Sequence, residues 1–193
     1  SRNTLQGSEL LGKNLLLVGF GRIGREVGKR AQAFGMQLHV YDPYVDEQQV
    51  GSAGAAYVKD LDTFLPKTDF LSLHLPYTPK NHHIIGHEEL RALPSSAYVI
   101  NTARGGLIDE NELFKALESG NLAGAGLDCF EQEPPSKNLK LLTSGKVIVS
   151  PHNASLTAEC TRRLGLVCVE NVVDALTGCL KKERVVNWDA VHA

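Results

Sequence analysis

The stretch LLLVGFGRIGREV at positions 15–27 constrains the fold of this chain more than any other. Its leading apolar residues predict a parallel strand that is covered on both faces. Three glycines follow in the spacing G-x-G-x-x-G: Gly19, Gly21 and Gly24. A helix is predicted directly afterwards, with apolar residues on one face: Ile23, Val27, Ala31 and Phe34. A strand, this glycine spacing and a helix in succession are typical of a dinucleotide-binding site.

Each glycine has its own physical role in such a site. Gly19 would permit the tight turn after the strand, Gly21 would let the backbone approach a diphosphate, and Gly24 would let the helix lie close to the strand. The diphosphate would bind the unpaired N–H groups at the helix N-terminus, because the helix dipole favours negative charge there. We therefore expect residues 19–24, including Arg22 and Ile23, to contact the cofactor.

Asp42 ends the next predicted strand and lies 18 residues after Gly24. This is close to the spacing expected for the carboxylate that binds the adenosine ribose. The carboxylate would repel the 2′-phosphate of NADP, and no arginine follows within the next several residues to bind that group. The sequence therefore predicts NAD as the cofactor. The alternative is a glycine-rich turn beside an aspartate that only caps a loop.

Composition argues against several classes of function. The chain has 193 residues, and its net charge of −2 gives no basic surface for nucleic acid or for a membrane. No apolar run approaches the ~18 residues of a membrane span, and no signal peptide is visible. The cysteines lack C-x-x-C spacing and indicate free thiols in a cytoplasmic protein: Cys129, Cys160, Cys168 and Cys179.

Predicted strands and helices alternate along the chain, which indicates an α/β fold with a Rossmann-type, doubly wound parallel sheet. We expect residues 13–180 to form this nucleotide-binding domain, between a linker or crossover segment at 1–12 and a tail at 181–193. A long helix that ends near Gly178 is predicted after the last strand. Its inward face would carry Cys160, Leu164, Val167, Cys168, Val172, Ala175 and Leu176.

Three candidate catalytic residues follow the ends of predicted strands, where ligands bind in open parallel sheets. Arg104 could bind a carboxylate through two parallel hydrogen bonds. His152 titrates near neutral pH and could transfer a proton, while Glu133 could hold its imidazole in one tautomer. Taken singly, these residues could instead form a loop ion pair, a capped helix start and a solvated turn. Their common position favours a site for an anionic substrate.

A histidine cluster before residue 90 suggests a metal site at first sight, since His83 and His87 lie four residues apart and His82 is adjacent. Gly86 and the surrounding turn signals argue against a shared helical face, and no cysteine or carboxylate pattern completes a ligand set. We expect surface histidines and no metal.

Five motifs stand in the order typical of D-isomer-specific 2-hydroxyacid dehydrogenases, and the chain resembles that family from about residue 8 to residue 187. The motifs are Gly19–Gly24, His74-Leu-Pro76-Tyr-Thr78, Asn101-Thr-Ala-Arg-Gly-Gly106, Asp128-Cys-Phe130 with Glu133-Pro134, and Pro151-His152. Residues 24–27 and 151–155 are most similar to the D-3-phosphoglycerate dehydrogenase-like branch.

The resemblance implies hydride transfer between NAD and a D-2-hydroxy acid or its 2-keto acid. It implies that Arg104 binds and polarises the substrate, that Glu133 pairs with His152, and that His152 is the acid/base. Asp128 would bind the nicotinamide carboxamide, and Thr102 and Ala103 would line the nicotinamide ring. The full set of implied cofactor contacts also includes His74, Pro76, Thr78 and His152.

The family's chains begin with a substrate-binding domain that this sequence does not contain. We therefore expect the isolated chain to lack full activity, and we expect a homodimer because relatives commonly dimerise through the nucleotide-binding domain. Two other functions remain open. One is an NAD-sensing interaction module similar to a corepressor, and the other is a methyltransferase, which can also pair a glycine-rich loop with an acidic residue.

Overall fold

The structure is a computed structural model, and it describes residues 7–191. The chain divides into two compact units, residues 1–152 and residues 153–193. The linker or crossover segment expected at 1–12 lies partly outside the described residues, and residues 7–10 have no regular structure. The boundaries expected at residues 13 and 180 stay a prediction.

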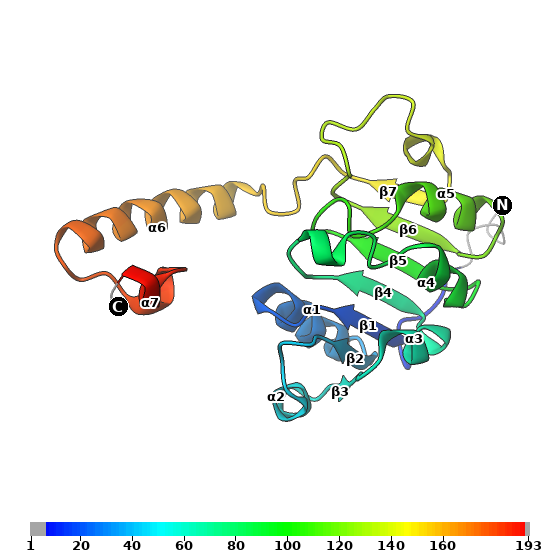
Figure 1. Ribbon diagram of the computed structural model, residues 1–193, viewed down its shortest axis with the longest axis horizontal. Coiled ribbons are helices and arrows are strands. Elements are labelled where there is room, and N and C mark those ends of the chain that lie inside the picture. Colours follow the sequence, from blue (N-terminus) through cyan, green and yellow to red (C-terminus); the bar gives the residue numbers. More distant parts are fainter. Residues whose placement is uncertain (1–6, 192–193) are drawn as a thin grey trace. The chain divides into compact units, whose positions relative to one another are not determined.

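A single parallel sheet organises the first unit. Its seven strands, counted over the described residues, stand in the order β3-β2-β1-β4-β5-β6-β7 (Figure 1). The strands are β1 (Asn14–Val18), β2 (Gln37–Tyr41), β3 (Ala56–Tyr57), β4 (Phe70–Leu73), β5 (Tyr98–Asn101), β6 (Gly124–Leu127) and β7 (Val147–Val149). From β1 the chain runs outward to β2 and β3, and then returns to β4 on the other side of β1. This reversal confirms the doubly wound fold and places a ligand crevice at the ends of β1 and β4.

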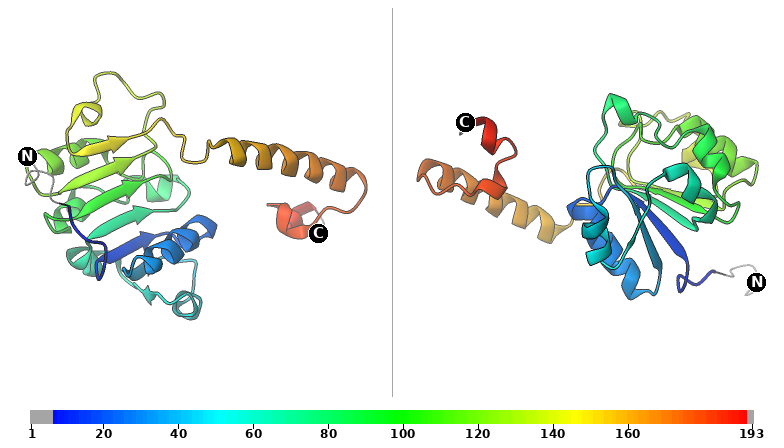
Figure 2. Two further views of the ribbon diagram at one scale, coloured as in Figure 1. Left: turned by 180° about the vertical axis from the view of Figure 1, so that it is seen from behind. Right: turned by 60° about the horizontal axis from the view of Figure 1, so that its bottom comes forward.

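Helices cover the two faces of the sheet, as Figure 2 shows. On one face, α1 (Arg22–Ala33) and α2 (Glu47–Ser52) pack on Leu15 and Leu17 of β1. On the other face, α3 (Leu61–Phe64), α4 (His87–Ala92) and α5 (Glu110–Glu118) pack on Leu16 and Val18. Successive residues of β1 are therefore buried on opposite faces, as expected of a strand inside a two-sided sheet.

The buried face of α1 matches the expected one only in part, since Ala31 is buried and Val27 packs against the core. Gly24, Gly28 and Ala31 are buried, whereas Ile23 and Phe34 are 68% and 65% exposed. The small residues bring the helix close to the sheet, because a Cβ at Gly28 would lie only 2.7 Å from the side chain of Leu38. Phe34 already lies past the end of the helix.

The second unit contains the long helix α6 (Ala158–Leu176), a 3₁₀ turn at 182–184 and the short helix α7 (Trp188–Val191). The helix occupies the span expected from the sequence, but none of its residues is buried. The expected inward face was therefore wrong for this structure: Leu164 is 55% exposed and Leu176 is 83% exposed. Neither α6 nor another helix of the described chain is both long and apolar enough to cross a membrane.

Candidate active site

The loop after β1 packs directly against the end of β4. Gly19 has a φ of +98°, and a Cβ at this position would lie 2.7 Å from the carbonyl group of His74. A Cβ at Gly24 would overlap the carbonyl oxygen of Gly19. Both positions therefore require glycine for reasons internal to the protein: a left-handed backbone and a close approach of two chain segments.

Nothing inside the protein requires glycine at position 21. Its φ of −73° and ψ of −160° are open to any residue, and a Cβ there would meet no protein atom within 4 Å. The residue lines a cavity and precedes α1, whose first turn has no side-chain cap and no acidic residue. The space and the N–H groups of this turn fit the diphosphate of a dinucleotide.

The cavity has a volume of about 810 Å³ and lies at the ends of β1, β2 and β4. Six residues expected to bind the cofactor line it: Gly19, Gly21, Asp42, His74, Pro76 and Thr78. The sequence analysis missed nine other lining residues, four of which are Tyr44, Lys80, Asn81 and Ile84. These four belong to loops whose pattern carries no signal for a binding site.

Asp42 holds the glycine loop against the end of β2. One carboxylate oxygen accepts a hydrogen bond from the Phe20 N–H at 2.7 Å, and the other accepts one from the Tyr44 N–H at 2.9 Å. A carboxylate has about four acceptor positions, so each oxygen can also accept a hydrogen bond from a ribose hydroxyl. Asp42 thus has the loop-capping role named in the alternative interpretation, and its remaining acceptor positions also suit a ribose.

His74 forms a neutral part of the cavity wall. Its Nε2 lies 2.9 Å from the Ser72 hydroxyl, and burial lowers the pKa of His74 to about 4. The imidazole is therefore uncharged at neutral pH.

The loop after β5 carries Arg104 and is fixed by Asn101. The Asn101 side chain is only 2% exposed; its amide donates to the Arg104 carbonyl at 2.8 Å, and its oxygen accepts from the Ala103 N–H at 3.0 Å. The guanidinium of Arg104 is exposed and donates to the Ala103 carbonyl at 2.6 Å. Asn101 is a functional residue that the sequence analysis quoted without assigning a role, although a polar residue that ends an apolar strand is a usable signal.

The side chains of Glu133 and His152 are in contact. Glu133 Oε2 lies 2.7 Å from His152 Nδ1, and Glu133 Oε1 accepts from the Phe130 N–H at 3.1 Å. The His152 hydrogen bond, the Phe130 N–H and the charge of Arg104 hold the pKa of Glu133 below its usual value. His152 has a φ of +52°, a strained conformation for a residue other than glycine and one that clusters at functional sites.

Asp128 lies inside the protein, with 3% of its surface exposed. Its Oδ1 accepts from the Ser150 hydroxyl at 2.6 Å, and its N–H donates to the Asn101 carbonyl at 3.0 Å. The neighbouring Cys129 is also buried, and burial raises the pKa of its thiol to about 12. The expected contacts of Thr102, Ala103 and Asp128 with nicotinamide stay predictions, as these residues do not line the cavity.

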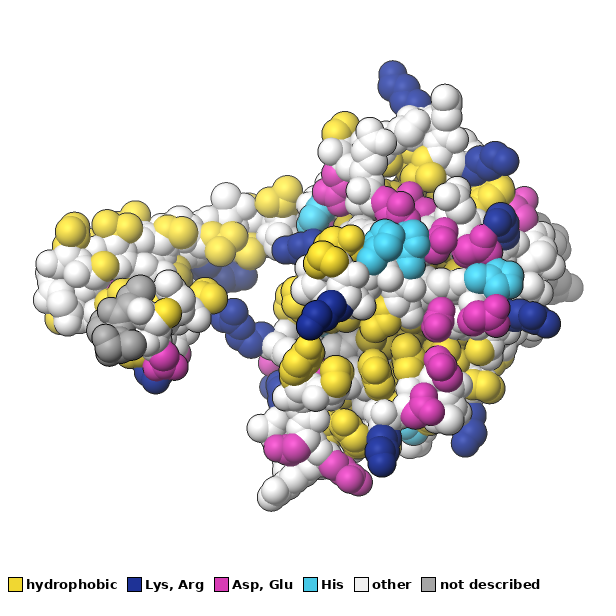
Figure 3. Space-filling view, in the orientation of Figure 1, with side chains coloured by type: hydrophobic (Ala, Val, Ile, Leu, Met, Phe, Trp, Pro, Cys, Tyr) yellow, Lys and Arg dark blue, Asp and Glu magenta, His cyan; other side chains and the backbone are white. Residues whose placement is uncertain are grey.

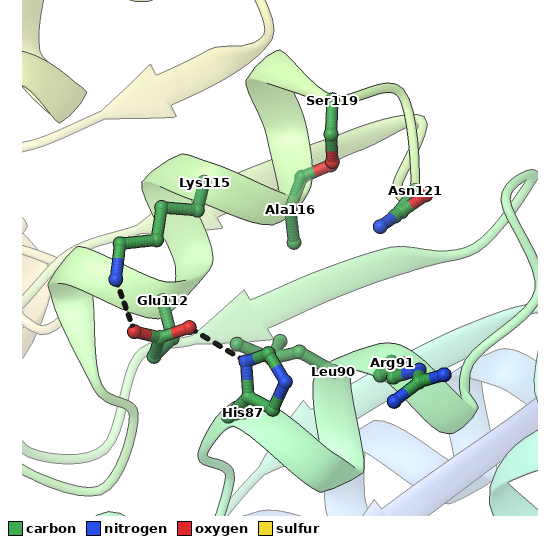
Figure 4. Close-up of a pocket in the computed structure, with 8 residues that line it drawn as sticks. All are labelled: His87, Leu90, Arg91, Glu112, Lys115, Ala116, Ser119 and Asn121. Atoms are coloured by element: carbon green, nitrogen blue, oxygen red, sulfur yellow. Dashed lines mark hydrogen bonds and ion pairs between the residues drawn. The ribbon is translucent and has the colours of Figure 1, made fainter.

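A second cavity of about 310 Å³ lies between α4 and α5 and contains none of the expected site residues (Figure 4). There His87 Nδ1 lies 2.8 Å from Glu112, which also pairs with Lys115 at 2.5 Å. The other two histidines of the sequence cluster have different partners: His83 pairs with Glu131, and His82 contacts Tyr77.

Comparisons with known proteins agree with this geometry. Residues 1–154 match the family model described as D-isomer specific 2-hydroxyacid dehydrogenase, NAD binding domain. The chain is 44% identical over 186 residues to D-3-phosphoglycerate dehydrogenase of Methanocaldococcus jannaschii, covering 96% of this chain and 35% of the relative. It is 45% identical over 177 residues to hydroxypyruvate reductase of Thermotoga maritima, covering 91% and 56%.

Solved structures give the same result. The NAD-complexed D-isomer specific 2-hydroxyacid dehydrogenase of Lactobacillus delbrueckii ssp. bulgaricus matches with a TM-score of 0.84 and 30% identity, over 93% of this chain and 58% of that chain. The chain thus spans about a third to just over half of the length of these relatives. The family match also removes the ground for the methyltransferase alternative. Sequence, fold and glycine-loop geometry together place this chain in the D-isomer specific 2-hydroxyacid dehydrogenase family, as its NAD-binding domain.

Proposed function

We propose that this chain is the cofactor-binding and catalytic half of a dehydrogenase that interconverts a D-2-hydroxy acid and its 2-keto acid. The observation that carries the proposal is the Glu133–His152 pair, 2.7 Å apart and following the strand ends of a sheet whose glycine loop fits a dinucleotide. NAD, when bound, supplies the hydride chemistry at its nicotinamide ring.

The pairing leaves one imidazole nitrogen for the substrate. Because Nδ1 of His152 faces Glu133, Nδ1 carries the proton in the neutral ring and Nε2 is the basic nitrogen. In the oxidative direction Nε2 takes the proton of the substrate hydroxyl. In the reductive direction the protonated ring donates a proton from Nε2 to the substrate carbonyl oxygen. The carboxylate of Glu133 stabilises the imidazolium form in both cases.

Arg104 supplies positive charge on the same side of the site. Its guanidinium is exposed, and its charge contributes to the lowered pKa of Glu133, so the two groups are close enough to interact. A guanidinium can bind the substrate carboxylate through two parallel hydrogen bonds. It also stabilises negative charge that develops on the carbonyl oxygen during reduction.

Fluorescence titration with NADH and NADPH tests the cofactor part of this proposal. We expect the chain to bind NADH more tightly, and Asp42→Ala to narrow the difference in affinity, because the variant removes a carboxylate that repels a 2′-phosphate. Asp46→Ala is the matched control, since Asp46 caps α2 and does not line the cavity. An unchanged preference in Asp42→Ala would contradict the assignment.

The same chain tests the catalytic part. We expect it to bind NADH but to reduce 2-keto acids far more slowly than the full-length protein. Positioning and closure can supply ~7–11 kcal/mol of barrier reduction, and Arg104 is exposed in this chain. Rapid turnover by the isolated chain would contradict this expectation, and failure to bind NADH would refute the proposed function.

A further inference from the structure

Three loops meet beside the Glu133–His152 pair. They follow β4, β5 and β6 and comprise residues 74–86, 102–109 and 128–133. The second loop carries Arg104 and the third carries Glu133, so their relative position sets the geometry of the proposed catalytic groups. The first loop carries no residue with a proposed catalytic role.

The first two loops are joined through their backbones. The His83 N–H donates to the Gly106 carbonyl at 2.7 Å, and the Ile85 N–H donates to the Leu107 carbonyl at 3.1 Å. The ring of Tyr77 covers Gly106, where a Cβ would lie 2.9 Å from the ring edge. Residues 83–85 therefore have a fixed position relative to the Arg104 loop.

The side chain of His83 extends this connection to the third loop. Its Nε2 lies 2.9 Å from Glu131 Oε1, and its Nδ1 lies 3.5 Å from Asp109 Oδ2. His83 has a φ of +51°, a conformation that residues other than glycine adopt only when their surroundings hold them there. Figure 3 shows histidine and acidic side chains side by side on this face of the molecule.

The carboxylates around His83 lie close enough together to repel one another. Glu110 and Glu131 exchange hydrogen bonds, since the Glu131 N–H donates to Glu110 at 2.6 Å and the Glu110 N–H donates to Glu131 at 3.3 Å. Burial raises the pKa of Glu110, and the charge of Glu131 acts in the same direction while the charge of His83 opposes it. Asp109 and Glu131 both contact the His83 imidazole, and Glu110 is hydrogen-bonded to Glu131. Without the contact to His83, repulsion among the three carboxylates would displace Glu131.

A displacement of Glu131 would also move Glu133, because both residues belong to the same turn. Phe130, the preceding residue, donates its N–H to Glu133 Oε1 at 3.1 Å. Its carbonyl packs so closely on Gly105, next to Arg104, that a Cβ at Gly105 would overlap it. The position of Phe130 therefore determines one of the two hydrogen bonds that orient the Glu133 carboxylate.

We propose that His83 is a positioning residue: by holding Glu131 against α5, it fixes the turn at residues 130–133 so that Glu133 faces His152. The inference rests on the proposed function, in which Glu133 and His152 are the acid/base pair. His83 does not touch the substrate and acts only through Glu131.

The experiment measures the pKa of Glu133 by carbon-13 NMR in the 193-residue chain, which needs no turnover. His83→Asn is the first variant, because asparagine accepts a left-handed backbone but is too short to reach both Asp109 and Glu131. We expect the pKa of Glu133 to rise by about 0.5 unit or more, as its orienting hydrogen bonds weaken. The matched control is His87→Gln, which removes the similar pair with Glu112 and should leave Glu133 unchanged.

Glu131→Ala separates positioning from simple charge effects. Removal of a nearby negative charge would by itself lower the pKa of Glu133, whereas loss of the positioning contact raises it. We expect the pKa of Glu133 to rise in Glu131→Ala. Adding His83→Asn should not raise it further, because both changes break the same contact between His83 and Glu131. A fall or no change in Glu131→Ala overturns the proposal, and this variant also decides the matter if His83→Asn does not fold.

Activity of the full-length protein distinguishes this proposal from the proposed function. We expect His83→Asn to lower kcat several-fold with little change in the KM for NADH, because the cofactor cavity contains neither His83 nor Glu131. If Glu133→Gln leaves turnover unaltered while the NMR results stand, the proposed acid/base role fails and the positioning contact remains. If the NMR results fail while Glu133→Gln abolishes turnover, only the role of His83 is refuted.

Discussion

Acidification from pH 7 to pH 5 is expected to destabilise residues 1–152 through His74. The folded state lowers the pKa of this imidazole from 6.5 to about 4 because it is buried. Between these values the unfolded chain binds more protons than the folded one, so the free energy of unfolding rises with pH. The contribution of His74 is complete above pH 6.5 and is lost as the pH falls toward 4.

The size of the effect follows from the shift. A shift of about 2.5 units corresponds to roughly 3 kcal/mol in total, of which about 2 kcal/mol is lost between pH 7 and pH 5. This is a large part of the ~5–15 kcal/mol that stabilises an ordinary domain. The comparison variant is His74→Gln, whose amide can still reach the Ser72 hydroxyl but does not titrate.

Urea unfolding at both pH values measures the difference. All five tyrosines lie between residues 41 and 98, whereas the single tryptophan is Trp188, so near-ultraviolet circular dichroism of tyrosine follows the first unit and tryptophan fluorescence follows the second. We expect the wild-type chain to lose about 2 kcal/mol more than His74→Gln. Contributions of other groups, such as His39, whose pKa is lowered by burial, are common to both proteins. Equal losses would show that His74 titrates as it does in the unfolded chain.

Two further predictions concern the catalytic loops. Gly105→Ala should destabilise the first unit by at least ~2 kcal/mol, because the new Cβ overlaps the Phe130 carbonyl. Gly126→Ala is the control, since a Cβ there would lie 4.0 Å from its nearest neighbour. Equal urea midpoints for the two variants would contradict the packing argument. In the full-length protein, His152→Ala should lower turnover ~10²–10⁴-fold by removing proton transfer, while the affinity for NADH changes little. Steady-state kinetics measures the effect, and an unchanged kcat would exclude His152 as the acid/base.

The amino-acid sequence by itself determined the order and type of the main elements. Strand and helix formation depend on local periodicity, so the apolar run at 15–18 predicted β1 and the apolar spacing after it predicted α1. Of the three glycines at 19–24, Gly24 is required by a neighbour in the same loop, the Gly19 carbonyl, whereas Gly19 is also required by the distant His74 carbonyl. The predicted strands also have predicted ends, so the sequence placed Arg104, Glu133 and His152 after the ends of strands, at one edge of the sheet.

Only the tertiary structure decided which of these segments touch. Phe20 and Asp42 are joined across 22 residues, and His83 and Glu131 across 48; both contacts exist because the sheet places β1 beside β2, and β5 between β4 and β6. The same holds for burial, since Gly24, Gly28 and Ala31 of α1 meet the sheet while Ile23, from its apolar stripe, is exposed. Helical periodicity shows which residues share a face, but it contains no information on what that face will pack against, and that depends on the arrangement of the whole chain.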